Sequence, residues 1–348
     1  YNILLRASPR RRSFTGRVEI DAQARTQTDS LELHARGLRL LAASVVCGGK
    51  RLVARVQKHK ERETVSLHLP RPVRGRLTIV CDYDGKLGAG MHGLYLAQDG
   101  TERAIVSQCE ATDARAIFPC LDEPAFKAKL AWQVQTDAGL CVVTNGVPRG
   151  SQKVRGKDEV LHTFAPTHPV STYLSAVTIG HFEASRTQKV LGTPCRVLAG
   201  VNKVAQTAFA QSVTAFVLPY YTDYFGQRYR YQKLDQVAVP GFDAGAMENV
   251  GAIFYRQTLL LMQQDAVSWS GQKRIAEVIA HEIAHQWFGN LVTMQWWDDL
   301  WLNEAFATWI AYKVCDVWHP EWRMWDDFFV SKMDAMHADG LASTHPIY

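Results

Sequence analysis

Two histidines and two glutamates have the types and spacing needed for metal-assisted hydrolysis. His281, Glu282 and His285 form an H-E-x-x-H run, and Glu304 follows after eighteen intervening residues. If the run is helical, a four-residue step turns the chain by roughly 400°, so both imidazoles project from one face and can reach one metal ion. Zinc accepts two imidazoles and one carboxylate, and catalytic sites keep a fourth position open for water. Glu282 is then free to act as a base.

This pattern is rare by chance. The chain has 12 histidines and 34 acidic residues among 348, so a His-acid-x-x-His match is expected roughly 0.04 times in a chain of this composition. An amphipathic helix that carries two surface histidines by accident is therefore the weaker interpretation, and the downstream Glu304 weakens it further.

The composition is that of a globular protein. Hydrophobic residues make up 47% of the chain, and the length suits two domains. The net charge of +5 is modest. Arg10–Arg12, the densest basic stretch, is typical of a solvated loop or strand edge, so we expect no nucleic-acid partner. No apolar run approaches the roughly twenty residues of a membrane span.

The cysteines and the ends of the chain bear on its location. Seven cysteines without C-x-x-C spacing favour a reducing compartment, and we expect a cytoplasmic protein. The chain begins at Tyr1 rather than at a methionine and ends at Tyr348. We therefore expect a fragment, with any targeting segment outside it.

Two patterns divide the chain near residue 183. Residues 1–183 contain short alternating or β-branched runs such as Gly16–Ile20, separated by turn residues, which predicts a mostly antiparallel β domain. The pair Asn145-Gly146 indicates a tight turn. After Val201 apolar residues recur at helical spacing, so residues 184–348 are expected to form a helix-rich domain. The predicted fold class is α+β.

Two predicted helices must position the candidate metal ligands and the candidate base. One covers residues 271–288, and the other runs from about residue 298 to residue 314. Gly289 and Asn290 suit the end of the first, and Asp298 or Asp299 suits the cap of the second. Aromatic residues near them are interpreted as packing residues rather than as a ligand platform. These are Trp296, Trp297, Trp301 and Trp309.

A second motif lies upstream, in PGFDAGAMENVGAIFY, where Glu248 precedes His281 by thirty-three positions. This G-A-M-E-N run, followed by H-E-x-x-H and a distant glutamate, resembles the M1 family of zinc metallo-aminopeptidases. Two further blocks are similar to the family, SQCEATDARAIFPCLDEPAFKA at residues 107–128 and DDLWLNEAFATWI around Glu304. The resemblance therefore covers nearly the whole chain.

The resemblance implies a saddle-like antiparallel β domain followed by a thermolysin-like, helix-rich zinc peptidase domain, truncated here at its C-terminal end. It implies one Zn²⁺ per chain, held by His281, His285 and Glu304, and peptide substrates with a free N-terminus. It also implies that a tyrosine that stabilises the oxyanion, and the helical domains that close the active-site chamber, lie beyond Tyr348.

An aminopeptidase must also recognise a free α-ammonium group one residue from the scissile bond. Buried carboxylates do this through charge-assisted hydrogen bonds worth about 1.5–3 kcal/mol each. Glu248 is the first candidate; Glu110, which alone would be read as a surface glutamate, matches the position of the family's second carboxylate. Small residues let an extended peptide pair strand-fashion beside them. The expected substrate-binding set is Gln108, Glu110, Gly245, Ala246, Met247, Glu248 and Asn249.

The resulting hypothesis is a zinc-dependent aminopeptidase in which Glu282 takes a proton from water and delivers it to the leaving amine. One alternative is a thermolysin-type endopeptidase or a leukotriene-type epoxide hydrolase; the latter branch typically reads Gly-Gly-Met-Glu-Asn, whereas this chain has Ala246. The other is a non-catalytic peptide-binding fragment or a pseudo-peptidase scaffold, which intact zinc-site residues disfavour. Side-chain preference, physiological substrate and oligomeric state stay open.

Overall fold

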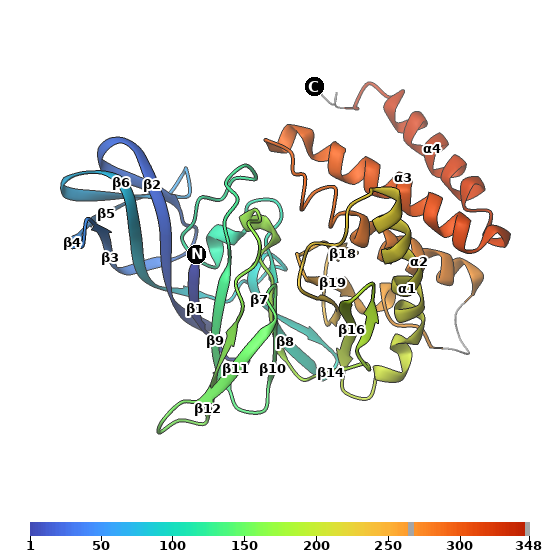
Figure 1. Ribbon diagram of the computed structural model, residues 1–348, viewed down its shortest axis with the longest axis horizontal. Coiled ribbons are helices and arrows are strands. Elements are labelled where there is room, and N and C mark those ends of the chain that lie inside the picture. Colours follow the sequence, from blue (N-terminus) through green and yellow to red (C-terminus); the bar gives the residue numbers. More distant parts are fainter. Residues whose placement is uncertain (264–267, 345–348) are drawn as a thin grey trace.

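The computed structural model describes residues 1–263 and 268–344 and has a β-rich half and a helical half (Figure 1). Most strand pairs of the β-rich half are antiparallel, as predicted, with β1 and β9 parallel. Its larger, nine-stranded sheet runs in the order β11 (Pro148–Lys153), β12 (Glu159–Phe164), β9 (Ala131–Asp137), β1 (Asn2–Arg6), β2 (Ser13–His34), β6 (Thr64–Lys86), β3 (Arg39–Cys47) and β4 (Lys50–Val53), with β5 (Arg55–His59) on β6.

Two smaller sheets connect this half to the helices. The four-stranded sheet has the order β10 (Cys141–Thr144), β13 (Val177–Gly180), β8 (Glu102–Gln108) and β7 (Gly93–Asp99). The third sheet is mixed and has the order β14 (Phe182–Ala184), β16 (Thr193–Gly200), β17 (Leu234–Val239), β19 (Ala252–Arg256) and β18 (Ala246–Met247), with β15 (Gln188–Val190) on β16.

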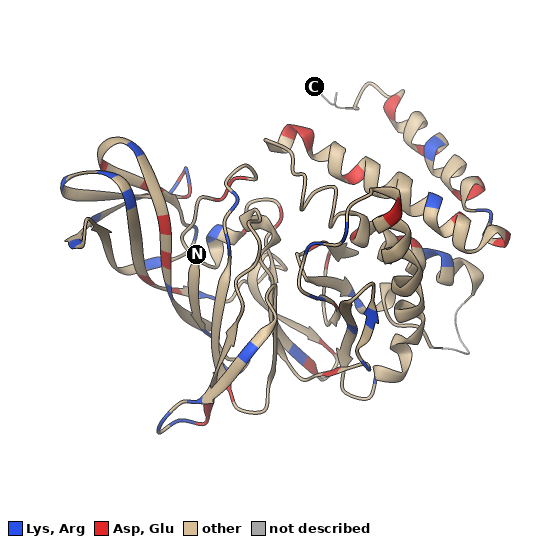
Figure 2. Ribbon diagram, in the orientation of Figure 1, with Lys and Arg blue, Asp and Glu red and all other residues tan. Residues whose placement is uncertain are grey.

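Helices gather on the far side of the third sheet (Figure 1). The α-helices in the described part of the chain are α1 (Ala208–Tyr224), α2 (Trp269–Ala284), α3 (Leu300–Trp318) and α4 (Met324–Asp339). With the β-rich half, they confirm the predicted α+β class. None of these helices is long and apolar enough to cross a membrane. Acidic and basic residues are interspersed over both halves (Figure 2).

The central strands of the third sheet, β17 and β19, are buried on both faces, and this places the site between two cores. Along β19, Ala252 and Phe254 pack into the core of the β-rich half, while Ile253 and Tyr255 pack among the helices. Successive side chains of a strand point to opposite faces, so a strand covered on both sides must be apolar throughout. The run Ala-Ile-Phe-Tyr meets that requirement, and the residues just before β19 are held rigidly as a result.

The turn predicted at Asn145-Gly146 is wrong. The pair forms a bend between β10 and β11, which belong to different sheets, and Asn145 is buried. Its Oδ1 accepts from Trp132 Nε1 at 3.3 Å and from the Ala176 amide at 2.8 Å. Its Nδ2 donates to the carbonyls of Leu174 at 2.8 Å and Val250 at 2.9 Å. The side chain thus ties the β-rich half to the segment that precedes β19.

The helix that carries the H-E-x-x-H run is shorter than predicted. Helix α2 ends at Ala284, and the amides of Gln286 and Trp287 bond to carbonyls three residues back, a tightening common where α-helices end. His285 nevertheless keeps helical angles (φ −55°, ψ −25°) and donates its amide to His281. The four-residue relation between the histidines therefore holds.

The tryptophan prediction is correct for two of the four residues. Trp297 packs edge-on against Tyr173 with ring centroids 5.3 Å apart, and Trp309 contacts Phe306 at 5.8 Å. Trp296 and Trp301 are instead 47% and 46% exposed in the described structure. For these two the packing interpretation is wrong, because Trp296 lies in the loop before α3 and Trp301 on the outer side of its first turn.

We expect Asn145→Ala to lower the free energy of unfolding by about 2–4 kcal/mol, because it leaves several buried backbone and side-chain groups unpaired. Urea unfolding followed by tryptophan fluorescence measures the change. Asn2→Ala, at an exposed strand position, is the matched control and should change stability by less than about 0.5 kcal/mol. Equal effects of the two substitutions would contradict the role given to Asn145.

Candidate active site

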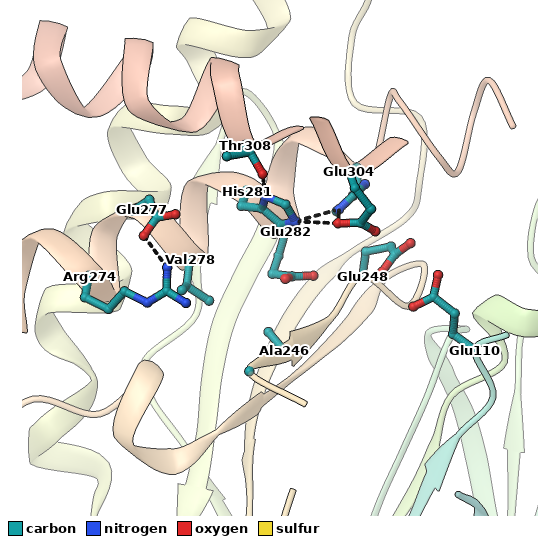
Figure 3. Close-up of a pocket in the computed structure, with 12 residues that line it drawn as sticks. Glu110, Ala246, Glu248, Arg274, Glu277, Val278, His281, Glu282, Glu304 and Thr308 are labelled. Carbon is teal, nitrogen blue, oxygen red and sulfur yellow. Dashed lines mark hydrogen bonds and ion pairs between the residues drawn. The ribbon is translucent and has the colours of Figure 1, made fainter. Parts of the chain in front are cut away.

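A cavity of about 410 Å³ lies where the third sheet meets α2 and α3 (Figure 3). Helix α2 contributes the H-E-x-x-H run, α3 contributes Glu304, and the G-A-M-E-N run and Glu110 approach from the sheets. The complete lining is Glu110, Gly245, Ala246, Glu248, Arg274, Glu277, Val278, His281, Glu282, His285, Glu304 and Thr308. The cavity is therefore rich in carboxylates.

The two histidines present their Nε2 atoms to each other at 2.9 Å. His285 Nδ1 lies 3.0 Å from the carbonyl oxygen of Phe288, which can only accept, so Nδ1 carries a proton. In the neutral ring this leaves a lone pair on Nε2. His281 Nδ1 lies 3.3 Å from Thr308 Oγ1, which fixes the orientation of the second ring. Such outer partners orient the histidines of metal sites.

Glu304 completes a three-donor cluster. Its Oε2 lies 3.3 Å from His281 Nε2 and 3.7 Å from His285 Nε2. Ligand atoms at 2.0–2.1 Å from a tetrahedral zinc ion are about 3.3 Å apart, and the three separations in the cluster scatter around that value. These residues fit a zinc ion by both geometry and ligand type.

The surrounding carboxylates favour positive charge at the cluster. Burial opposes protonation of His285, but Glu248, Glu304 and Glu282 together raise its pKa to about 10. Glu304 is affected in the opposite sense: burial favours its neutral form, yet hydrogen bonds to His281 and His285 hold its pKa well below the usual range. A cation placed among these groups is therefore strongly stabilised.

Glu282 points into the cavity beside the cluster (Figure 3). It is buried, and its Oε2 lacks a hydrogen-bond partner among the described residues. Burial raises the pKa of its carboxyl, and the nearby Glu248 and Glu304 raise it further, whereas His285 acts to lower it. Its position next to the cluster, without a partner of its own, is what a proton-transferring group requires.

The carboxylates of Glu110 and Glu248, which we call the ammonium clamp after the role proposed for them below, lie close together in the cavity (Figure 3). Ligand atoms of these two residues and of Glu304 lie within 4.8 Å of one another. Oε1 of each clamp residue is buried and has no partner among the described residues. Burial raises the pKa of both carboxyls, and Glu248 raises that of Glu110 further. Such orphaned acceptors call for a cationic donor.

The remaining predicted substrate residues fall into two groups. Gly245 and Ala246 line the cavity, and β18 is the terminal strand of its sheet, so one of its edges has no strand partner among the described residues. Gln108, Met247 and Asn249 lie behind that wall. Gln108 Nε2 donates to Met247 Sδ at 3.4 Å.

Two residues that position Glu248 were missed in the sequence. Gln286 Nε2 and Asn290 Nδ2 both donate to the carbonyl oxygen of Glu248, at 3.0 and 2.8 Å. From the β-rich half, Lys127 Nζ donates to the Asn290 carbonyl at 3.1 Å and Tyr173 donates to that of Gly289 at 3.1 Å. The loop after α2 thus joins the metal-site helix, Glu248 and the β-rich half. Bonds to a distant backbone carbonyl leave no sequence signal.

Three cavity residues on the helices were also missed. Arg274 and Glu277 precede His281 by seven and four positions, and Thr308 follows Glu304 by four, so all three share a helix face with the cluster. That spacing was visible in the sequence and could have identified them.

Two histidines one turn apart, a glutamate between them and a third donor on the next helix define the class of metallopeptidase-like sites. The sequence comparisons agree. A profile of the peptidase M1 N-terminal domain matches residues 1–174, and one of the peptidase family M1 domain matches residues 209–348. The chain belongs to peptidase family M1.

Individual relatives extend the comparison. The chain is 38% identical to Aminopeptidase M1-A of Oryza sativa subsp. japonica over 348 residues, covering 96% of this chain and 39% of that protein. It is 36% identical to human Endoplasmic reticulum aminopeptidase 1 over 358 residues, covering 100% of this chain and 38% of that protein. The chain therefore spans about two fifths of the length of these relatives.

We expect Asn290→Ala to loosen the G-A-M-E-N segment, because Glu248 loses one of its two amide donors. Hydrogen–deuterium exchange in a peptide that covers residues 245–249 should become faster, and stability should fall by about 1–3 kcal/mol. Gln211→Ala, which removes an exposed side-chain bond on α1, is the control. Unchanged exchange in Asn290→Ala would contradict the positioning role.

Proposed function

We propose that this protein is part of a zinc-dependent aminopeptidase that removes single residues from the N-terminus of peptides. The observation that carries the proposal is the ammonium clamp beside the three-donor cluster. The ammonium clamp suits a positively charged group of the substrate, and the neighbouring three-donor cluster suits a metal ion. A peptide held by its α-ammonium group in the clamp therefore presents its first peptide bond to the cluster.

His281, His285 and Glu304 would hold the zinc ion. When bound, zinc acidifies a water molecule and polarises the scissile carbonyl. Thr308 and the Phe288 carbonyl keep the two imidazole rings oriented toward the ion.

Glu282 acts as the base. It takes a proton from the attacking water and delivers it to the leaving amine, so one carboxyl serves both steps. Its raised pKa keeps it a competent acid once it has been protonated.

The ammonium clamp and β18 set the register of the substrate. Glu110 and Glu248 accept hydrogen bonds from the α-ammonium group, while the free edge of β18 at Gly245 and Ala246 pairs with the extended backbone. Gln108, Met247 and Asn249 support this wall from behind. A longer peptide cannot pass beyond the clamp without leaving its carboxylates unpaired, so cleavage stops after one residue.

Further features of the parent protein follow from the same proposal. We propose, from the family resemblance alone, that an oxyanion tyrosine and chamber-closing helical domains lie outside residues 1–348, and that the two domains divide at 183/184. The seven cysteines are all free, which suits the proposed cytoplasmic location.

We expect Glu282→Gln to retain zinc and to lose at least about a thousandfold in kcat, because the amide cannot take a proton. Zinc content by atomic absorption and turnover of an alanyl fluorogenic substrate are the measurements. Glu321→Gln, which removes an exposed carboxylate, should leave both unchanged. A Glu282→Gln protein with normal turnover would remove the proposed base.

We expect Glu248→Gln to raise KM for peptides with a free N-terminus about tenfold to a hundredfold, the equivalent of one lost charge-assisted hydrogen bond. Steady-state kinetics on one peptide with a free and with an acetylated N-terminus test this, with Glu61→Gln at an exposed position as the control. Equal cleavage of the two peptides by the unsubstituted protein would refute the exopeptidase proposal and favour an endopeptidase.

A further inference from the structure

The cavity has a second charged wall that the proposed chemistry does not use. Arg274 and Glu277 lie about two turns and one turn before His281 on α2 and line the cavity with Val278 (Figure 3). Arg274 Nη1 donates to Glu277 Oε2 at 2.5 Å. Both side chains are on the opposite side of Glu282 from the ammonium clamp (Figure 3).

The pairing of α2 with α3 gives the cavity a direction. His285 lies beside Glu304, and His281 lies beside Thr308, one turn later on α3, so the two helices run antiparallel along the cavity. The ammonium clamp lies at the Glu304 end. Glu277, one turn before His281, lies at the other end.

A substrate bound as proposed runs along this direction. With its ammonium group in the clamp and its first carbonyl beside the cluster, the next residue leads toward Glu277. One helix turn covers about 5.4 Å and one extended residue about 3.3–3.6 Å. A long side chain on the residue after the scissile bond therefore reaches Glu277. This step rests on the proposed function, because the clamp sets the direction.

The different burial of Glu277 and Arg274 indicates which ligand charge this wall of the cavity can bind. The Glu277 side chain is 11% exposed and the Arg274 side chain is 57% exposed, so the carboxylate is fixed while the guanidinium can turn into solvent. Arg274 is also the one lysine or arginine among the described residues that line the cavity. An incoming cation can replace it on Glu277, whereas an incoming carboxylate meets a predominantly acidic wall.

We propose that Glu277 is a specificity-determining residue that recognises a lysine or arginine side chain on the residue after the scissile bond. Arg274 is its partner while no substrate is bound. It competes with the substrate cation for the same carboxylate. Removing either residue should therefore change the preference, in opposite directions.

Equilibrium binding tests this without turnover. Calorimetry uses the zinc-loaded, full-length protein carrying Glu282→Gln, with the peptides Ala-Lys-Ala, Ala-Gln-Ala and Ala-Glu-Ala. We expect the lysine peptide to bind about fivefold more tightly than the glutamine peptide, the size typical of a partly exposed ion pair. Adding Glu277→Gln should bring the ratio close to one, Glu277→Asp should retain part of it, and Arg274→Gln should increase it.

Two results would overturn the inference: equal affinities for the lysine and glutamine peptides, or tightest binding of the glutamate peptide with loss in Arg274→Gln. An acetylated Ala-Lys-Ala separates this inference from the proposed function. If it binds as tightly as the free peptide, the ammonium clamp fails, while the lysine-to-glutamine ratio and its response to Glu277→Gln still report on Glu277.

Discussion

The convergence of three electron-rich atoms on one point is the constraint on which the rest of the structure depends. His281 Nε2, His285 Nε2 and Glu304 Oε2 lie 2.9–3.7 Å apart, and further carboxylates surround them. Without a metal ion or a bound proton this arrangement is costly, because two lone pairs and a carboxylate charge face each other at a partly buried point. The helix pair α2 and α3 maintains it by packing side by side. A bound metal ion would turn this electrostatic cost into binding energy.

The clamp is built from different parts of the chain than the cluster, and side-chain hydrogen bonds hold the two together. Glu110 follows β8, whereas Glu248 is in the loop before β19. The loop after α2 bonds to Glu248 through Gln286 and Asn290, and to the β-rich half through Lys127. In the proposed function, cleavage after one residue requires the clamp and the cluster to keep a fixed separation. The buried third sheet and these bonds supply that rigidity.

Local patterns predicted part of this structure. The helix around the H-E-x-x-H run could be predicted because apolar residues recur at helical spacing within that short segment. Runs of β-branched residues predicted strands in the same way. Glu304 was assigned to the metal site from its residue type and its place on a second predicted helix. Glu110 was placed near the histidines only through a family resemblance, since nothing local fixes a contact over such a separation. Asn145-Gly146 misled for the same reason: its turn preference is local, but its bonds reach Val250, 105 positions away. Gln286 and Asn290 act through side-chain bonds to one backbone carbonyl, which no periodicity reveals.

Anomalous diffraction at the zinc absorption edge, on crystals of the zinc-loaded protein, tests the central claim most directly. The account predicts one anomalous peak per chain, about 2.0–2.2 Å from the Nε2 atoms of His281 and His285 and from a carboxylate oxygen of Glu304. The peak should disappear in a His285→Ala variant that keeps its fold. A peak held by other residues, or no peak at a well-ordered cluster, would contradict the account.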